Sequence, residues 1–289
     1  MTKKKGKQQT WANDYFTAAL DNLERLQTVI DLSGQGISAI TQMPRLVEAL
    51  HKDESEVEAA KHRAGLAQAE MDRGFSTLIG FGVVALWSWL ETFVVDFLVL
   101  YIQRRPTSVR NLKAPKVKID LAEYSRLRGA ERARFIVDAV DRESNGPLRN
   151  GMGRFESLLA AIELKVPLEE GHRRDIFELQ QVRNCLSHRF GIIDRRLVQA
   201  CPWLKLKVGE PLGISRDDFH RYGAACARFL LLLLYETGDA INIDYRTAGE
   251  AAAAPIDGHQ QQPPKDRDGR VGQTLGQVQQ PEHDRRPQV

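Results

Sequence analysis

The chain has 289 residues, of which 42% are hydrophobic and 27% are charged, with 41 basic against 38 acidic side chains. This composition is typical of a soluble globular protein of one or two domains, and the near balance of charge excludes a histone-like polyelectrolyte role while leaving local basic patches open. Three scattered cysteines without CxxC or zinc-ligand spacing favour neither a disulfide scaffold nor a structural zinc, so a cytoplasmic location is expected.

Residues 1–72 are predicted to form an N-terminal helical extension. The basic N-terminus lacks the apolar run of a signal peptide. Apolar residues spaced by three and four predict a helix from Trp11, which the stretch SGQG at 33–36 is expected to break. The charged, alanine-rich stretch 43–73 predicts a solvated helix or a partner-binding arm.

Residues 74–103 are the most apolar stretch and predict a long helix that ends before Pro106. The uncharged run Gly74 to Leu90 is close to the lower limit of roughly 17 residues for crossing a bilayer. Glu91 and Asp96 then interrupt it, and a carboxylate inside a bilayer costs about 2.5 kcal/mol or more. A buried helix of a bundle is therefore favoured over a membrane anchor, because it also explains apolar residues on every face.

The segment 104–128 is predicted to be irregular and basic, with eight bases against two acids. Such a segment suits an RNA backbone, and the candidate RNA-binding residues are Arg104, Arg105, Lys116 and Lys118. The alternative is a solvated loop with surplus basic residues. A stacking platform is not expected, because Tyr124 is its only aromatic residue.

Three helices are predicted next, at 130–142, 153–165 and about 173–189. The stretch KLKVGEPLGIS at 205–215 is predicted to be an excursion with hairpin character. Ser215 with Asp218 predicts the capped start of a last helix that ends near Glu236. We expect residues 73–246 to form one all-α domain. The tail 247–289 is rich in Gln, Pro, Gly and charge, which predicts disorder.

The stretch RNCLSHRFG at 183–191 holds the candidate catalytic residues. Arg183 lies beside the apolar stripe of its predicted helix, and Asn184 and His188 point progressively away from that stripe. Glu91 is isolated in the apolar helix, where a lone carboxylate is costly. A contact between Glu91 and Arg183 would give each side chain a partner of opposite charge. We therefore expect Glu91 to orient the arginine.

These residue types suit phosphodiester chemistry. An arginine neutralises the charge that grows on the phosphate, a histidine transfers the proton, and an amide orients either group. The alternative is ordinary helix-end polarity around Gly191, because the RxxxxH spacing is short. Cys185 is disfavoured as a nucleophile, since it projects from the opposite side of Arg183 to His188.

The segment FELQQVRNCLSHRFGIIDRRLVQACP resembles the HEPN superfamily (higher eukaryotes and prokaryotes nucleotide-binding domains), whose hallmark is Arg, four to six residues and then His, with a polar residue directly after the Arg. LWSWLETFVVDFL resembles the first core helix of that family, with Glu91 matching its inward polar residue better than Asp96. GRFESLLAAIELKVP resembles the helix before the motif. The resemblance covers about 74–246.

The resemblance implies an up-and-down helical bundle acting as a metal-independent endoribonuclease. Two RxxxxH helices would meet in a homodimer, and the 2′-hydroxyl of the RNA would be the nucleophile. No cofactor or metal is expected; the expected partners are RNA, a second copy, and an antitoxin or another defence-system protein. Phe190 replaces the tyrosine that one toxin subgroup carries. The alternative is an inactive HEPN-type module for RNA binding or dimerisation.

Overall fold

The computed structural model describes residues 11–50, 53–111, 118–143 and 151–246. Within these ranges the chain is all-helical and contains no β-strand, which confirms that the fold is all-α. The α-helices are α2 (Trp11–Ile40), α3 (Met43–Ala49), α4 (Glu54–Asp72), α5 (Ser76–Arg104), α6 (Leu121–Arg126), α7 (Gly129–Glu143), α8 (Met152–Ala161), α9 (Glu170–Arg189), α10 (Arg195–Ala200) and α11 (Arg216–Ile241), with 3-10 helices at Pro106–Asn111 and Pro202–Leu204.

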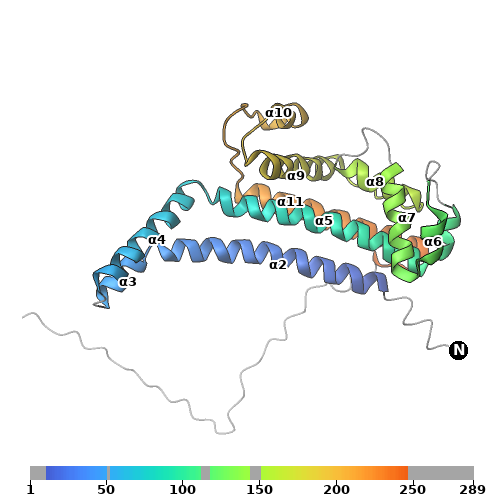
Figure 1. The fold of residues 1–289 in the computed structure, drawn as a ribbon, viewed down its shortest axis with the longest axis horizontal. Coiled ribbons are helices and arrows are strands. Elements are labelled where there is room, and N and C mark those ends of the chain that lie inside the picture. Colours follow the sequence, from blue (N-terminus) through green and yellow to red (C-terminus); the bar gives the residue numbers. More distant parts are fainter. Residues whose placement is uncertain (1–10, 51–52, 112–117, 144–150, 247–289) are drawn as a thin grey trace, which may run out of the picture.

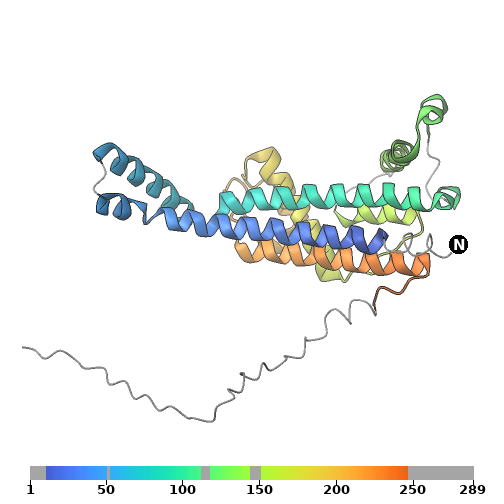
Figure 2. The same cartoon turned by 90° about the horizontal axis from the view of Figure 1, so that it is seen from below.

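Helix α5 is the central element of the bundle. It packs against α2, α7, α9 and α11, and α2, α5 and α11 lie side by side along the molecule (Figure 1, Figure 2). Trp87, Leu90, Val94 and Phe97 of α5 are fully or almost fully buried. By length and composition α5 could cross a membrane, and half of its most apolar window is buried inside the protein.

Helix α2 runs through the stretch SGQG without interruption, so the predicted break at 33–36 is wrong. Gly34 is buried at the crossing with the start of α5, where an added Cβ would lie 3.8 Å from Leu78 and 4.0 Å from Phe75. The Ser33 and Ser38 hydroxyls donate to the carbonyls of Val29 and Gly34, one turn earlier in the helix. Close helix packing at Gly34 therefore outweighs the low helix propensity of glycine.

The N-terminal extension is not separate from the bundle. Trp11, Phe16 and Leu23 of α2 belong to the same hydrophobic cluster as the core of α5 and α11. The end of α2 and the hairpin of α3 and α4 project beyond the bundle, as an arm (Figure 1, Figure 2). The boundary predicted at residue 72 therefore does not coincide with a break in the core, and α2 belongs with the predicted 73–246 domain.

The later helices begin close to their predicted positions. Helices α7, α8 and α9 begin at Gly129, Met152 and Glu170. At the start of α11, Ser215 and Asp218 form the predicted capping box, in which each side chain accepts a hydrogen bond from the other residue's backbone N–H. The predicted disordered tail, 247–289, lies outside the described residues.

Candidate functional site

Helix α9 lies on the outside of the bundle and carries the RNCLSHRFG stretch at its C-terminal end (Figure 1). Ile176, Leu179 and Val182 are buried against the core, as the apolar stripe predicts. Leu186 contacts α5, where an added Cβ on Gly80 would lie 3.5 Å from the leucine side chain. The core contacts therefore fix which face of α9 is turned outward.

The end of α9 is formed by two successive residues with positive φ. Phe190 has a φ of 53° and its backbone N–H donates to the carbonyl of Cys185, while Gly191 has a φ of 74°. A left-handed conformation is usual for glycine at a helix end and is uncommon for a bulky side chain. Gly191 takes part in this end as predicted, but Phe190 is the residue that caps the helix.

Arg183, Asn184 and His188 occupy neighbouring positions on the outward face of α9. The Arg183 Nη1 donates to the Asn184 Oδ1 at 3.2 Å. The Arg183 Nε is buried without a hydrogen-bond partner, and Arg183 forms no ion pair with any residue that the structure describes. His188 is exposed one turn after Asn184. The guanidinium charge of Arg183 is therefore uncompensated in a single copy.

Glu91 does not pair with Arg183, so the predicted contact between them is wrong. The Arg154 Nη1 of α8 donates to the Glu91 Oε1 at 2.7 Å, and Arg154 also binds Asp141 of α7 through two nitrogens, at 2.8 and 3.0 Å. Hydrogen bonds to Asp141 are the main reason that the pKa of the Arg154 guanidinium is raised. The charge of the Glu91 carboxylate is therefore compensated by Arg154, within a cluster of Glu91, Arg154 and Asp141.

The relative register of α5 and α9 explains why Glu91 and Arg183 do not contact each other. Helices α5 and α9 are antiparallel, with the end of α9 beside the start of α5 (Figure 1). Glu91 is eleven residues beyond Gly80, whereas Arg183 is three residues before Leu186, the residue opposite that glycine. At 1.5 Å per residue, the eight-residue difference places Glu91 and Arg183 roughly 12 Å apart along the helix axes. Glu91 is therefore not an orienting residue for Arg183.

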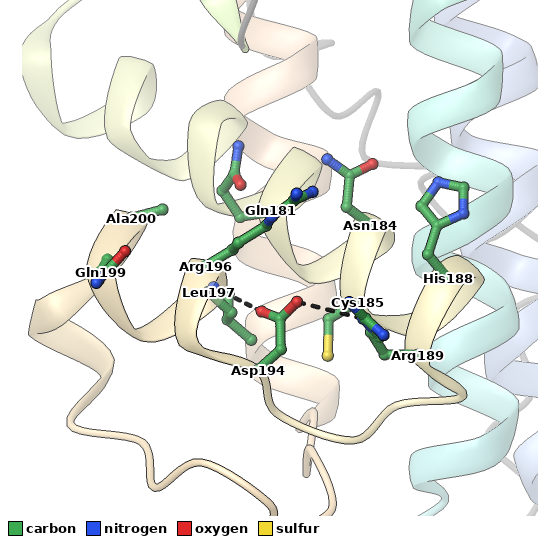
Figure 3. Close-up of a pocket in the computed structure, with 10 residues that line it drawn as sticks. All are labelled: Gln181, Asn184, Cys185, His188, Arg189, Asp194, Arg196, Leu197, Gln199 and Ala200. Atoms are coloured by element: carbon green, nitrogen blue, oxygen red, sulfur yellow. Dashed lines mark hydrogen bonds and ion pairs between the residues drawn. The ribbon is translucent and has the colours of Figure 1, made fainter.

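A cavity of about 700 Å³ lies between the last two turns of α9 and helix α10. Asn184 and His188 contribute to it from α9, together with Gln181. Helix α10 contributes Arg196, whose side chain runs toward α9 and ends beside Gln181 and Asn184 in the view of Figure 3. Arg183 is not among the residues that line this cavity, although it is hydrogen-bonded to Asn184, which does line it.

Asp194 organises the lower side of this cavity. Its carboxylate accepts a hydrogen bond from the backbone N–H of Leu197 at 2.9 Å, which caps α10, and pairs with Arg189 at 3.6 Å (Figure 3). Cys185 is buried, its Sγ donates to the Ile192 carbonyl at 3.2 Å, and burial raises its thiol pKa. Cys185 nevertheless lines the cavity together with His188, so the expectation that it is not a nucleophile rests on its burial and not on its separation from the histidine.

Large apolar side chains are exposed around the same end of α9. Phe190 is 97% exposed and Phe81 of α5 is 70% exposed. Both residues line a second hollow, which Leu186 and Pro211 also border. Ile192 and Val208 are exposed on the excursion between α9 and α11. Exposed apolar residues gathered in this way are typical of an interaction surface.

Arg104 and Arg105, two of the predicted RNA-binding residues, lie at the far end of α5 from this end of α9. Arg104 is 24 residues beyond Gly80 on α5, roughly 36 Å along the helix, and it is exposed. Arg105 donates to the Ala240 carbonyl of α11 and lies over the Tyr101 ring at 5.9 Å, so it stabilises the fold. Lys118 is exposed, and Lys116 lies outside the described residues.

Sequence reasoning missed two features near the candidate site. It assigned no role to Arg196, because the short helix α10 has no periodic pattern to place its side chains. It also missed Glu178, which is 1% exposed and accepts hydrogen bonds from Arg221, Tyr222 and Trp203. The signal for Glu178 is an acid that falls on the buried side of a predicted amphipathic helix.

Comparison of the chain with protein-family models, with curated proteins and with solved structures finds no match. Within the part of the chain that the structure describes, no group of three or more His, Cys, Asp and Glu side chains is arranged to hold a metal ion. The cavity between α9 and α10 is lined by an imidazole, three amides and two guanidinium groups, which suit an anion with several acceptor oxygens.

Proposed function

We propose that the protein is a cytoplasmic endoribonuclease that cleaves RNA without a metal ion, at a site formed by the α9 ends of two copies. The single observation that carries the proposal is the outward end of α9. There His188 and Asn184 line an open cavity with an arginine, next to the uncompensated charge of Arg183. The resemblance of this stretch to the HEPN motif points to the same chemistry.

In the proposed reaction the 2′-oxygen of the RNA attacks the neighbouring phosphorus, and the bond from phosphorus to the 5′-oxygen breaks. The His188 imidazole accepts the proton of the 2′-hydroxyl, and a protonated imidazole, supplied by the second copy, donates to the leaving 5′-oxygen. Arg183 neutralises the charge that grows on the phosphate, and Asn184 orients it. The products are a 2′,3′-cyclic phosphate and a free 5′-hydroxyl.

The proposal uses two copies because Arg183 does not line the cavity of His188 in one copy, so a second copy would supply the arginine. The exposed Phe81 and Phe190, which line one hollow at the α9 end, supply an apolar surface for a self-complementary contact. The strained backbone of Phe190 is further support, since strain of this kind is concentrated at functional positions. The proposal also includes a role in a toxin or phage-defence system with an antitoxin-like partner. That part is supported by the family resemblance alone.

The proposal is tested with the full chain and mixed RNA in EDTA. We expect cleavage that leaves 2′,3′-cyclic phosphate ends, and loss of at least a hundredfold in rate for Arg183→Ala and for His188→Ala, in line with general acid–base catalysis. His62→Ala, which removes an exposed histidine from the arm, is the matched control and should cleave normally.

Circular dichroism of each variant separates lost activity from lost folding. Cleavage that survives His188→Ala would contradict the proposal. The second candidate is an RNA-binding or dimerisation module without activity, favoured by the separation of Arg183 from the His188 cavity. RNA binding without any cleavage by the native chain would establish that module in place of the enzyme.

A further inference from the structure

Helix α10 brings an unpaired cation to the cavity of His188. Arg196 makes no ion pair, hydrogen bond or ring contact with any residue in the ranges that the structure describes, although it lines the cavity between α9 and α10. The other arginine of this cavity, Arg189, is paired with Asp194. Arg196 is therefore the lining residue whose charge is free to meet a ligand.

The carboxylate oxygens that line the cavity already have partners within the protein. Asp194 is the carboxylate of the lining, and it caps α10 and pairs with Arg189. The remaining polar side chains, Gln181 and Asn184 among them, can donate hydrogen bonds to oxygen atoms. A free guanidinium beside amide donors and an imidazole selects an anion with several acceptor oxygens, such as a phosphodiester.

The position of Arg196 is fixed by the anchoring of α10 at both ends. Asp194 caps its first turn, and Leu197 is buried beneath it. After the helix, Trp203 donates to Glu178 on the buried side of α9 and lies 6.4 Å from the Phe177 ring. Because α10 is held against α9 in this way, the distance between Arg196 and His188 is set by the fold of a single copy.

We infer that Arg196 binds a phosphate of the RNA backbone next to the scissile bond and so seats the strand against His188 of the same copy. This inference rests on the proposed function and assigns the substrate contact that one copy makes alone. Arg183 then acts across the dimer, while Arg196 holds the strand within each copy. RNA therefore enters along the groove between α9 and α10, away from the basic segment after α5.

The test compares Arg196→Ala with Arg195→Ala, its neighbour on the same helix, which carries the same charge and lines only the adjacent hollow beside His188, outside the cavity between α9 and α10. Both are made in the His188→Ala chain, so that binding of a fluorescein-labelled single-stranded oligouridylate is measured without cleavage. We expect Arg196→Ala to weaken binding about tenfold and to lower the slope of log affinity against log salt by about 0.7, the value for one phosphate contact to a single strand. Arg195→Ala should change the slope by much less.

The same substitutions are then measured for cleavage in the chain that keeps His188. Arg196→Ala should raise KM with a smaller effect on kcat, because the residue positions the strand and takes no part in proton transfer. Arg196→Lys should restore the salt slope and part of the affinity, since it keeps the charge and loses the two-nitrogen geometry.

The outcomes separate the two proposals. Equal binding by the Arg196→Ala and Arg195→Ala chains would overturn the role of Arg196, while cleavage that depends on His188 would still stand. Selective loss of binding in the Arg196→Ala chain without any cleavage by the native chain would support Arg196 and overturn the nuclease. A native chain that neither binds nor cleaves the oligouridylate or mixed RNA would overturn both.

Discussion

At the scale of single residues, the most informative finding is the partner of Glu91. A carboxylate in an apolar helix needs a cation, and the sequence offers many. In the structure the partner of Glu91 is Arg154, which also forms an ion pair with Asp141. Arg154 of α8 thus links α5 to α7. The side chains of these three residues are less than one third exposed. Glu91 therefore contributes to the packing of the bundle through this cluster.

A double-mutant cycle on Glu91→Gln and Arg154→Met should give a coupling energy of about 1 to 2 kcal/mol in the free energy of unfolding, because the partly buried pair is hydrogen-bonded. The parallel cycle on Glu91→Gln and Arg183→Met should give a value near zero. Urea unfolding followed by circular dichroism measures both. A coupling energy that is larger for the Glu91 and Arg183 cycle than for the Glu91 and Arg154 cycle would support the contact predicted from the sequence.

The three cysteines should be inert in the folded protein. Burial raises the pKa of the Cys201 thiol from 9.0 to about 12, and burial raises the pKa of Cys185 and Cys226 as well. The folded state therefore holds its thiol protons more tightly than the unfolded state. Its stability should fall as the pH rises from about 9 toward 12.

Ellman's reagent at pH 8 tests this expectation. The native chain should show almost no reactive thiol, and the chain unfolded in guanidinium should show all three. Rapid reaction of one thiol in the native chain would reveal an exposed or activated cysteine and would reopen Cys185 as a nucleophile.

At the scale of elements, the excursion between α9 and α11 depends on a buried carboxylate. Glu178 accepts hydrogen bonds from Tyr222 at 2.7 Å and from Arg221 at 2.6 Å, and its other oxygen accepts one from Trp203. One acid thus joins α9 to α11 and to the 3-10 turn after α10. The placement of Arg196 follows from this link, since Trp203 is the anchor that closes the excursion.

Trp203→Phe keeps a ring against Phe177 and removes the indole donor, so it should cost about 1 kcal/mol in global stability. Its local effect should be larger, because the excursion loses the bond that holds it to Glu178. Hydrogen exchange followed by mass spectrometry should show faster exchange in peptides covering 195–212. Arg174→Ala, which removes only the cation over the Trp203 ring, is the milder control. Unchanged exchange in both variants would show that the excursion is held by its apolar contacts.

At the scale of the whole molecule, the apolar surface around the α9 end predicts self-association. Phe190→Asp should convert a dimer into a monomer and should not lower the stability of the monomer. Phe190 is 97% exposed, and aspartate tolerates its left-handed backbone better than phenylalanine does. Leu50→Asp on the arm, where the side chain is 69% exposed, should leave the dimer intact. Sedimentation velocity distinguishes these states, and a native chain that is monomeric throughout would contradict the dimer.

The sequence predicted those features that depend on local periodicity or on end signals. The apolar length of α5, the core stripe of α9 and the Ser215 cap of α11 are of this kind. It did not predict the partner of Glu91, because the register between two helices is set by packing at Gly80 and Leu186. The position of Arg196 was missed for a similar reason: the short helix α10 is held against α9 by Trp203, which bonds Glu178 at a position 25 residues earlier in the chain.

The continuity of α2 has a practical consequence for how the chain can be divided. A fragment that begins at residue 73 would lack the helix that covers Phe93 and Phe97 of α5, both of which pack against Phe16. Those aromatic rings would then meet water, and the fragment would precipitate or recruit a substitute for the missing helix. A fragment that begins at Trp11 and replaces only residues 41–72 with a short linker would keep that cover and remain soluble.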